Sequence, residues 1–278
     1  MIKFKDFQYR YPENLSWALD SINLEIPKGQ FCAVVGPSGA GKSTFCYALS
    51  GFAPHFFRGE WKGRLNIGSI EVGKSSLGEL SAEVGLVFQN PFNQISGARF
   101  TVREEIAFGL ENLGLGRSKI KDRIASSMEL VGVADLANRS PFALSGGQQQ
   151  RVAIASILAM QPKVLVLDEP TSQLDPRGSE EVFAALNALA EDSKTTVILV
   201  EHKLEWVAAF ADRVVHLYAG QVVADGPASE VLVSEDAAKY GIEETIFTAV
   251  AREALKADLV STKGALPITL EQGKAFLS

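Results

Sequence analysis

The feature that most constrains this chain is a glycine-rich turn at residues 36–43, whose sequence is GPSGAGKS. The apolar run Phe31–Val35 precedes it, and a helical pattern from about Lys42 to Ser50 follows it. An unbroken apolar run is typical of a strand that is covered on both faces. The turn therefore predicts a buried strand that leads directly into a helix, as in parallel α/β sheets.

The same turn fits the pattern G-x-x-x-x-G-K-[ST], in the strand-to-helix context that gives the pattern its meaning. Its glycines let backbone N–H groups point inward at an anion, and the dipole of the following helix adds to the attraction. Lys42 is expected to reach the β- and γ-phosphates, and the Ser43 hydroxyl to ligate Mg²⁺. A turn without a ligand is the alternative, but eight matching positions favour nucleotide binding. The predicted nucleotide-binding residues of this phosphate loop are Gly36, Pro37, Ser38, Gly39, Ala40, Gly41, Lys42, Ser43 and Thr44.

Further short apolar runs alternate with helical patterns along the chain, which predicts a parallel-rich α/β fold. Before the phosphate loop, two segments of alternating polarity predict an antiparallel opening sheet. The expected strands are 3–9, 22–26, 31–35, 84–88, 164–167, 197–200 and 214–218, and the expected helices are 102–113, 118–131, 148–160, 176–191 and 203–210.

The chain is expected to divide into two parts. Residues 1–233 read as one domain, within which residues 90–161 are mostly helical and form an insertion. Residues 234–278 read as a helical extension and tail, interrupted by a break at Ser261–Gly264.

Composition excludes several classes of protein. The net charge is −6, so there is no excess of positive charge to drive binding to a phosphate backbone, and no nucleic-acid partner is expected. The two cysteines, Cys32 and Cys46, cannot form a disulfide framework and are expected to be buried thiols. The start of the chain does not resemble a signal peptide, and no apolar run approaches the ~18 residues of a membrane span.

Two carboxylates follow the apolar run Val164–Leu167. The carboxyl ends of parallel strands are where α/β sheets place their ligands. Asp168 is suited to hold the Mg²⁺ shell, and Glu169 to polarise an attacking water as general base. Two acids that merely end a strand are the alternative, and the phosphate loop makes it the weaker one.

The stretch Leu144–Arg151, with sequence LSGGQQQR, resembles the signature of the ATP-binding cassette (ABC) ATPases. Physically it is a second anion cradle, with a serine and two glycines at the start of a helix. Other family elements appear in order. They are Tyr11 as an adenine-stacking aromatic, Gln89 as the Q-loop glutamine, Ser172–Asp175 as the D-loop and His202 as the switch histidine.

The resemblance implies an ABC ATPase fold, which is a P-loop NTPase (RecA-like) core with an antiparallel β subdomain and a helical insertion. It implies ATP and Mg²⁺ as ligands, with Ser43, Gln89 and Asp168 at the metal and Glu169 and His202 as catalytic residues. In this family ATP is sandwiched between two chains, so the resemblance implies an identical or homologous second cassette. That partner would bring Ser145, Gly146, Gly147 and Gln148 to the nucleotide in trans, while Asp175 belongs to the D-loop.

Finer likenesses point to the energy-coupling factor (ECF) class of vitamin and metal-ion importers. They lie in Val87–Ile95, in Val102–Leu113 and in Glu201–Glu205. This class implies a transmembrane coupling protein and a substrate-binding membrane subunit as partners, with the ATPase peripheral on the cytoplasmic face of the membrane. Phe92 and Gln173 depart from the pattern, because many such ATPases have an acidic residue and a small residue there.

Two other functions remain open at this point. One is a soluble ABC ATPase that acts on nucleic acid or on a protein without transport. The other is a cassette that binds ATP but is catalytically degenerate, against which Gln89, Asp168, Glu169 and His202 argue.

An apolar set in the helical insertion has two interpretations. Phe92, Ile95, Phe100 and Phe108 could form a groove for a cytoplasmic helix of a membrane protein, or the small core of the insertion. The aromatic stretch Phe52–Phe57 with Trp61 is similarly either packing beneath the opening sheet or a surface.

Overall fold

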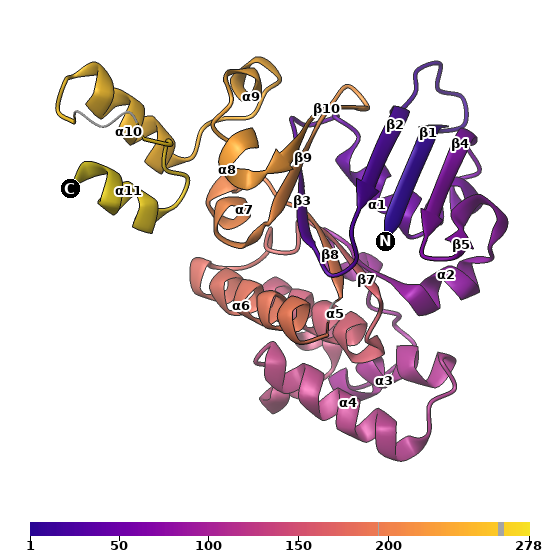
Figure 1. Ribbon diagram of the computed structural model, residues 1–278. Helices are drawn as coiled ribbons and strands as arrows, with labels where there is room; N and C mark the ends of the chain where they lie inside the picture. Colours follow the sequence, from indigo (N-terminus) through magenta and orange to yellow (C-terminus); the bar gives the residue numbers. More distant parts are fainter. Residues whose placement is uncertain (194, 261–263) are drawn as a thin grey trace.

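The computed structural model describes residues 1–193, 195–260 and 264–278. Two sheets form its centre, and helices cover the faces of the larger one (Figure 1). The smaller sheet is antiparallel, with strand order β2-β1-β4-β5. The larger sheet has six strands in the order β10-β9-β3-β8-β7-β6, and all its pairs are parallel except β9 with β10.

The antiparallel sheet contains both strands predicted near the N-terminus and two that the sequence pattern missed. The predicted ones are β1 (Ile2–Arg10) and β2 (Leu19–Ile26). The missed ones are β4 (Glu60–Ile67) and β5 (Ile70–Glu71). The first five residues of β4 are exposed, so this strand lacks the alternating burial that marks a strand in sequence.

The parallel strands of the larger sheet are short and completely buried, which explains their unbroken apolar sequences. They are β3 (Phe31–Val35), β6 (Val84–Val87), β7 (Val164–Asp168) and β8 (Thr196–Val200). On the far edge, β9 (Arg213–Tyr218) and β10 (Gln221–Pro227) form a hairpin. Because β3, β7 and β8 run in parallel, their carboxyl ends meet at one edge and deliver the phosphate loop, Asp168 and Glu201 to the same place.

The six helices predicted before residue 211 are present, with boundaries that differ by a few residues, whereas the short helices at Leu77–Glu83 and Ala228–Val231 were not predicted. Residues 90–161 contain three helices and short 3₁₀ turns but no strand, and this segment lies between β6 and β7. In Figure 1, α3 and α4 project below α5 at the bottom of the view. The helices are α1 (Lys42–Leu49), α2 (Leu77–Glu83), α3 (Val102–Asn112), α4 (Arg117–Leu130), α5 (Gly146–Met160), α6 (Pro176–Ser193), α7 (Leu204–Phe210), α8 (Ala228–Val231), α9 (Glu235–Lys239), α10 (Ile246–Lys256) and α11 (Leu270–Leu277).

Three clusters of buried apolar side chains hold these layers together. One fills the space between the antiparallel sheet, α1 and one face of the larger sheet, where Phe4 and Phe45 stack with ring centroids 4.8 Å apart. A second joins the opposite face to α3–α6. The third packs β3 and β9 against α7 and α8, and includes Ile242 from the extension.

The expected division of the chain into residues 1–233 and 234–278 stays a prediction. The expected break at Ser261–Gly264 falls mostly on residues 261–263, which lie outside the described ones.

The aromatic stretch after α1 divides between the two roles expected for it. Phe52 and Phe57 pack against the first cluster, whereas Phe56 is 63% exposed and Trp61 is 42% exposed.

Cys32 and Cys46 are fully buried free thiols, as expected, and burial raises the pKa of Cys32 to about 12. Among the described helices, none is both long and apolar enough to cross a membrane.

Candidate functional site

The phosphate loop joins β3 to α1, and its backbone leaves no room for side chains at two of its glycines. Gly36 has φ +150°, and a Cβ there would lie 2.1 Å from the carbonyl oxygen of Leu217. Gly41 has φ +104°, and its Cβ would lie 2.5 Å from the carbonyl oxygen of Ala18. Gly41 is also the N-cap of α1 and provides no side-chain cap. The N–H groups of the first turn are therefore available to an anion.

Lys42 folds back along this loop. Its Nζ donates hydrogen bonds to the carbonyl oxygens of Gly36 at 2.8 Å and Pro37 at 2.9 Å. Burial lowers the pKa of Lys42, while the nearby carboxylates of Glu169 and Asp168 oppose that change. The ammonium group is thus held at the loop by neutral acceptors, which a phosphate oxygen can replace with a stronger, charged one.

Tyr11 lies beside the start of α1. Its hydroxyl is 3.1 Å from Oγ1 of Thr44, and its ring packs edge-on against Tyr9 and Phe57. Burial raises the pKa of Tyr11, and the hydrogen bond with Thr44 opposes that change. The structure therefore joins this predicted adenine-stacking residue to the phosphate loop.

Asp168 ends β7 next to Ser43. Its side chain is buried, and a hydrogen bond from Ser43 lowers its pKa, although burial has the larger effect and raises it. Its Oδ1 has no hydrogen-bond partner. A buried carboxylate oxygen without a partner, beside a hydroxyl oxygen, is the kind of oxygen-donor environment that Mg²⁺ prefers. The pair therefore fits the predicted metal site.

Glu169 is the meeting point of two other predicted residues. Nε2 of Gln89 donates to its Oε2 at 2.6 Å, and Nε2 of His202 lies 3.0 Å from its Oε1. The residue has φ 48° in the left-handed region, and its N–H donates to the carbonyl of Val200 on β8. Strain of this kind persists where the surroundings hold it. The structure thus places Gln89 against Glu169, whereas the resemblance assigned it to the metal.

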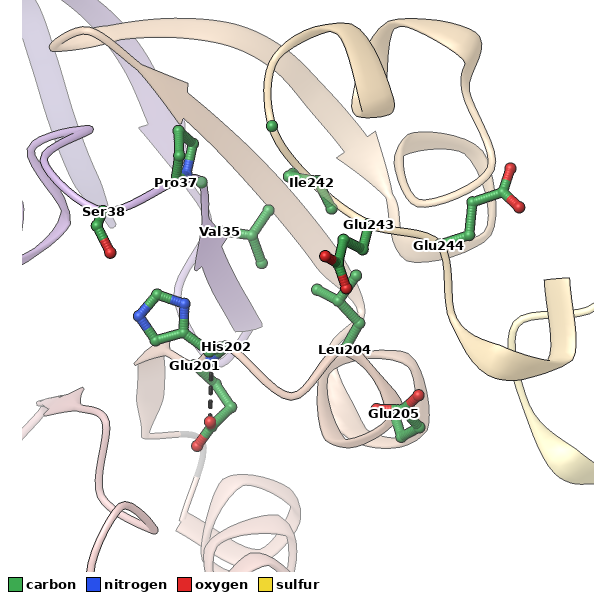
Figure 2. A pocket seen from close by; sticks show the side chains of 12 residues that line it. Val35, Pro37, Ser38, Glu201, His202, Leu204, Glu205, Ile242, Glu243 and Glu244 are labelled. Atoms are coloured by element: carbon green, nitrogen blue, oxygen red, sulfur yellow. Dashed lines mark hydrogen bonds between the residues drawn. The ribbon is translucent and has the colours of Figure 1, made fainter. Parts of the chain in front are cut away.

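A cavity of about 360 Å³ opens between the phosphate loop and the loop after β8 (Figure 2). Pro37 and Ser38 line one side, and His202 lines another. The extension forms a further wall of this cavity, where Gly241 lies against the Pro37 ring. This cavity adjoins the loop that is expected to hold the nucleotide's phosphates.

The signature residues lie elsewhere on the chain. Ser145 caps α5, accepting a hydrogen bond from the N–H of Gln148 while the Gln148 side chain accepts one from the N–H of Ser145. Ser145 and Gly146 are exposed. Ser145, Gly147 and Gln148 line a second cavity of about 530 Å³ that has no residue in common with the first. One chain therefore does not bring its two anion cradles together.

Asp175 lines the signature cavity as well. Its Oδ1 accepts a hydrogen bond from the N–H of Gly178 at 2.7 Å and so caps the start of α6. The backbone of Gln173 lies against Gly147, where a Cβ would be 3.2 Å from the Gln173 carbonyl oxygen. The D-loop therefore packs on the signature helix of its own chain.

Sequence reasoning missed three polar residues that connect these loops. Glu201 and Thr171 are both buried and form a hydrogen bond of 2.8 Å. Gln94 accepts from the N–H of Phe88 and donates to the carbonyl of Ala153, which ties the segment after β6 to α5. Gln94 and Glu201 lie in two of the segments that are similar to the ECF class, but neither was predicted as a site residue. Their positions, five residues after Gln89 and directly before His202, were the further signal.

The apolar set in the insertion is split between surface and core. Phe92 is 60% exposed and Phe100 86% exposed, while Ile95 and Phe108 are half-buried. The guanidinium of Arg99 lies over the ring of Phe108 at 5.4 Å. The two phenylalanines on the surface are thus available to a partner.

Comparison with known proteins adds independent evidence. The family model described as ABC transporter matches residues 19–172. A protein of Pyrococcus horikoshii named "Putative ABC transporter ATP-binding protein" is 47% identical over 83% of this chain and 81% of its own length. A relative of the same name from Methanosarcina acetivorans is 44% identical over 83% of this chain but only 36% of its own length.

Two solved structures are similar as well. CbiO1 from Clostridium perfringens, described as part of the ABC transporter complex CbiONQ, has a TM-score of 0.74 at 30% identity and covers 91% of this chain and 93% of its own. The cassette MJ0796, described as a dimer in a post-hydrolysis state with ADP and Pi, has a TM-score of 0.72 at 31% identity over 82% of this chain and 99% of its own. The predicted fold class is confirmed.

Proposed function

This chain belongs to the ABC transporter ATP-binding family, and from that premise we propose that it is the ATP-hydrolysing subunit of a membrane importer of the ECF type. As a member of the family it binds ATP with Mg²⁺. The likeness to CbiO1, a component of CbiONQ, supports the importer class, as do the sequence likenesses to ECF ATPases. The imported molecule would be a vitamin, a metal ion or a similar micronutrient.

The observation that carries hydrolysis is the placement of Glu169 between Gln89 and His202, next to the phosphate loop. Glu169 accepts the proton of the attacking water as general base, and His202 orients Glu169 from the side of the phosphates. Lys42 leaves the carbonyls of Gly36 and Pro37 and places its charge on the β- and γ-phosphate oxygens. Mg²⁺, held by Ser43 and Asp168, would neutralise charge on the phosphates.

The complete site is proposed to need two chains. The exposed cap of α5 offers a serine hydroxyl and free N–H groups to an anion, yet it lines a cavity separate from that of the phosphate loop. A second cassette, identical or homologous, would place its Ser145–Gln148 on the γ-phosphate held by the first. The dimeric form described for MJ0796 supports this arrangement.

We assign the membrane-facing surface to the exposed side chains of Phe92 and Phe100. Phe92 lies three residues after Gln89 in the chain, so a partner seated on it would be close to the segment that contacts Glu169. The proposed partners are a transmembrane coupling protein and a substrate-binding membrane subunit. The chain would then be peripheral on the cytoplasmic face, with residues 1–233 as the ATPase domain and 234–278 as the extension.

The test combines ATP hydrolysis with purification from membranes. The tagged chain, extracted from its own host's membranes with detergent, is expected to co-purify with polytopic membrane proteins and to release phosphate from ATP. Phe92→Glu with Phe100→Glu should abolish co-purification and leave hydrolysis by the isolated chain unchanged. Leu15→Glu, at a side chain that is 94% exposed in another loop, is the matched control. Association with nucleic acid or ribosomes in place of membrane proteins would favour the soluble class instead.

A further inference from the structure

Glu201 is a buried carboxylate for which the mechanism above has no role. The residue as a whole is only 5% exposed, and its carboxylate lies between two loops. Oε2 accepts a hydrogen bond from the hydroxyl of Thr171 at 2.8 Å. Oε1 accepts from the N–H of His202 at 2.9 Å, drawn as a dashed line in Figure 2, and from the N–H of Lys203 at 3.2 Å.

The two loops that Glu201 joins are the ones that carry the proposed base and the switch histidine. Thr171 is two residues after Glu169, and the same turn is fastened on its other side, where the hydroxyl of Ser172 donates to the carbonyl of Gln89. His202 directly follows Glu201. The two loops therefore contact each other at two points. One is the 3.0 Å contact between Nε2 of His202 and Oε1 of Glu169, and the other is Glu201, which accepts hydrogen bonds from Thr171 and from the N–H of His202.

We propose that Glu201 is a positioning residue for ATP hydrolysis, which sets the geometry between His202 and Glu169 by holding Thr171 and the N–H groups of residues 202–203. The proposal rests on the proposed ATPase function. A carboxylate is suited to the task, because burying its charge is costly unless several donors satisfy it, so its three donors are held in one arrangement. Displacement of a reacting group by even about 1 Å can cost roughly 100-fold in rate.

The primary experiment is a double-mutant cycle in the isolated full chain. Glu201→Ala is expected to lower kcat by about 10- to 100-fold while the Kd for ATP, measured by calorimetry, changes by less than about twofold. His202→Ala removes the group through which Glu201 is proposed to act. The double variant should therefore be about as slow as His202→Ala alone, because the two residues form one unit. Glu201→Gln keeps an acceptor oxygen and should recover most of the lost rate.

Two further measurements cover the case in which Glu201→Ala fails to fold. Thr171→Val keeps the side-chain shape and removes only the donated hydroxyl, and it should lower kcat by about 3- to 10-fold, again without adding to His202→Ala. Hydrogen–deuterium exchange at the amides of residues 202 and 203 should accelerate in Glu201→Ala or Glu201→Gln, since these N–H groups lose or weaken their acceptor. Glu253→Ala, which removes a carboxylate that is 72% exposed on α10 and lines neither cavity, is the matched control and should match the wild type.

The outcomes separate the two proposals. If the wild-type chain releases no phosphate from ATP either alone or in the detergent-extracted complex, which would supply a homologous second cassette, the proposed function fails, and the role of Glu201 fails with it. If only the complex is active, the double-mutant cycle is measured in the complex. If the wild type is active, a kcat for Glu201→Ala within about threefold of the wild type overturns the positioning role alone. Rate losses of Glu201→Ala and His202→Ala that multiply in the double variant overturn it as well.

Discussion

Replacing Glu169 by Gln separates the chemistry of this side chain from its shape. Both carboxylate oxygens have partners, with Gln89 at 2.6 Å and His202 at 3.0 Å. A glutamine keeps one oxygen to accept from Gln89, and its amide nitrogen can donate to the Nε2 of a neutral His202. The substitution is therefore expected to leave the fold and this contact intact while removing the base.

The expected loss of turnover is about 10²- to 10⁴-fold, the usual contribution of a positioned general base. At 1.36 kcal/mol for each factor of ten, this raises the barrier by about 2.7 to 5.4 kcal/mol. The affinity for ATP should be equal or higher, because the substitution removes the negative charge of Glu169 near Lys42, and that charge repels the negatively charged triphosphate.

The assay measures phosphate release at saturating ATP together with ATP binding by calorimetry. Glu253→Gln, on the exposed face of α10, is the control for the same chemical change at a distant site. Turnover of Glu169→Gln within about threefold of the wild type would refute the reasoning, because a base that is removed cannot leave the rate unchanged.

Three further predictions concern the phosphate loop, the second chain and the metal site. Lys42→Ala should weaken ATP binding by at least about tenfold, because a buried charge that faces the phosphates is lost; calorimetry with wild-type affinity would contradict the loop assignment. Ser145→Arg should stop hydrolysis and leave ATP binding to the monomer intact, and mixing it with Lys42→Ala chains should restore one working site. No phosphate release from that mixture would count against a shared site. For Asp168, burial raises the pKa above 3.8, so its ionised form destabilises the ligand-free fold at neutral pH and the cost disappears on acidification. Asp168→Asn should therefore abolish Mg²⁺-dependent hydrolysis yet raise the Tm of the ligand-free chain at about pH 8, and a gain that grew as the pH fell towards 3.8 would contradict this.

The sequence alone determined the elements whose signals are local. The glycine pattern of residues 36–43 and the unbroken apolar runs of β3, β7 and β8 predicted the parallel sheet, because burial on both faces requires a continuous apolar segment. It also placed Asp168 and Glu169 at a strand end. Strand β4 escaped detection, since only two of its eight residues are buried and its pairing with β1 joins residues that are 50 (Arg10 with Glu60) to 65 (Ile2 with Ile67) positions apart.

Tertiary structure alone decided which residues meet. The Glu169 contacts with Gln89 and His202 join segments that are far apart in the chain, and the Thr171–Glu201 bond spans thirty residues. The hydrogen bond from Gln89 to Glu169, and the division of the insertion's aromatic side chains into exposed Phe92 and Phe100 and half-buried Phe108, are likewise visible only in the folded chain. The local sequence encodes helix and strand propensity and the periodicity of apolar residues. Which side chains come into contact at the edge of the sheet depends instead on strand register and on side-chain burial, and both are set only when the whole chain packs.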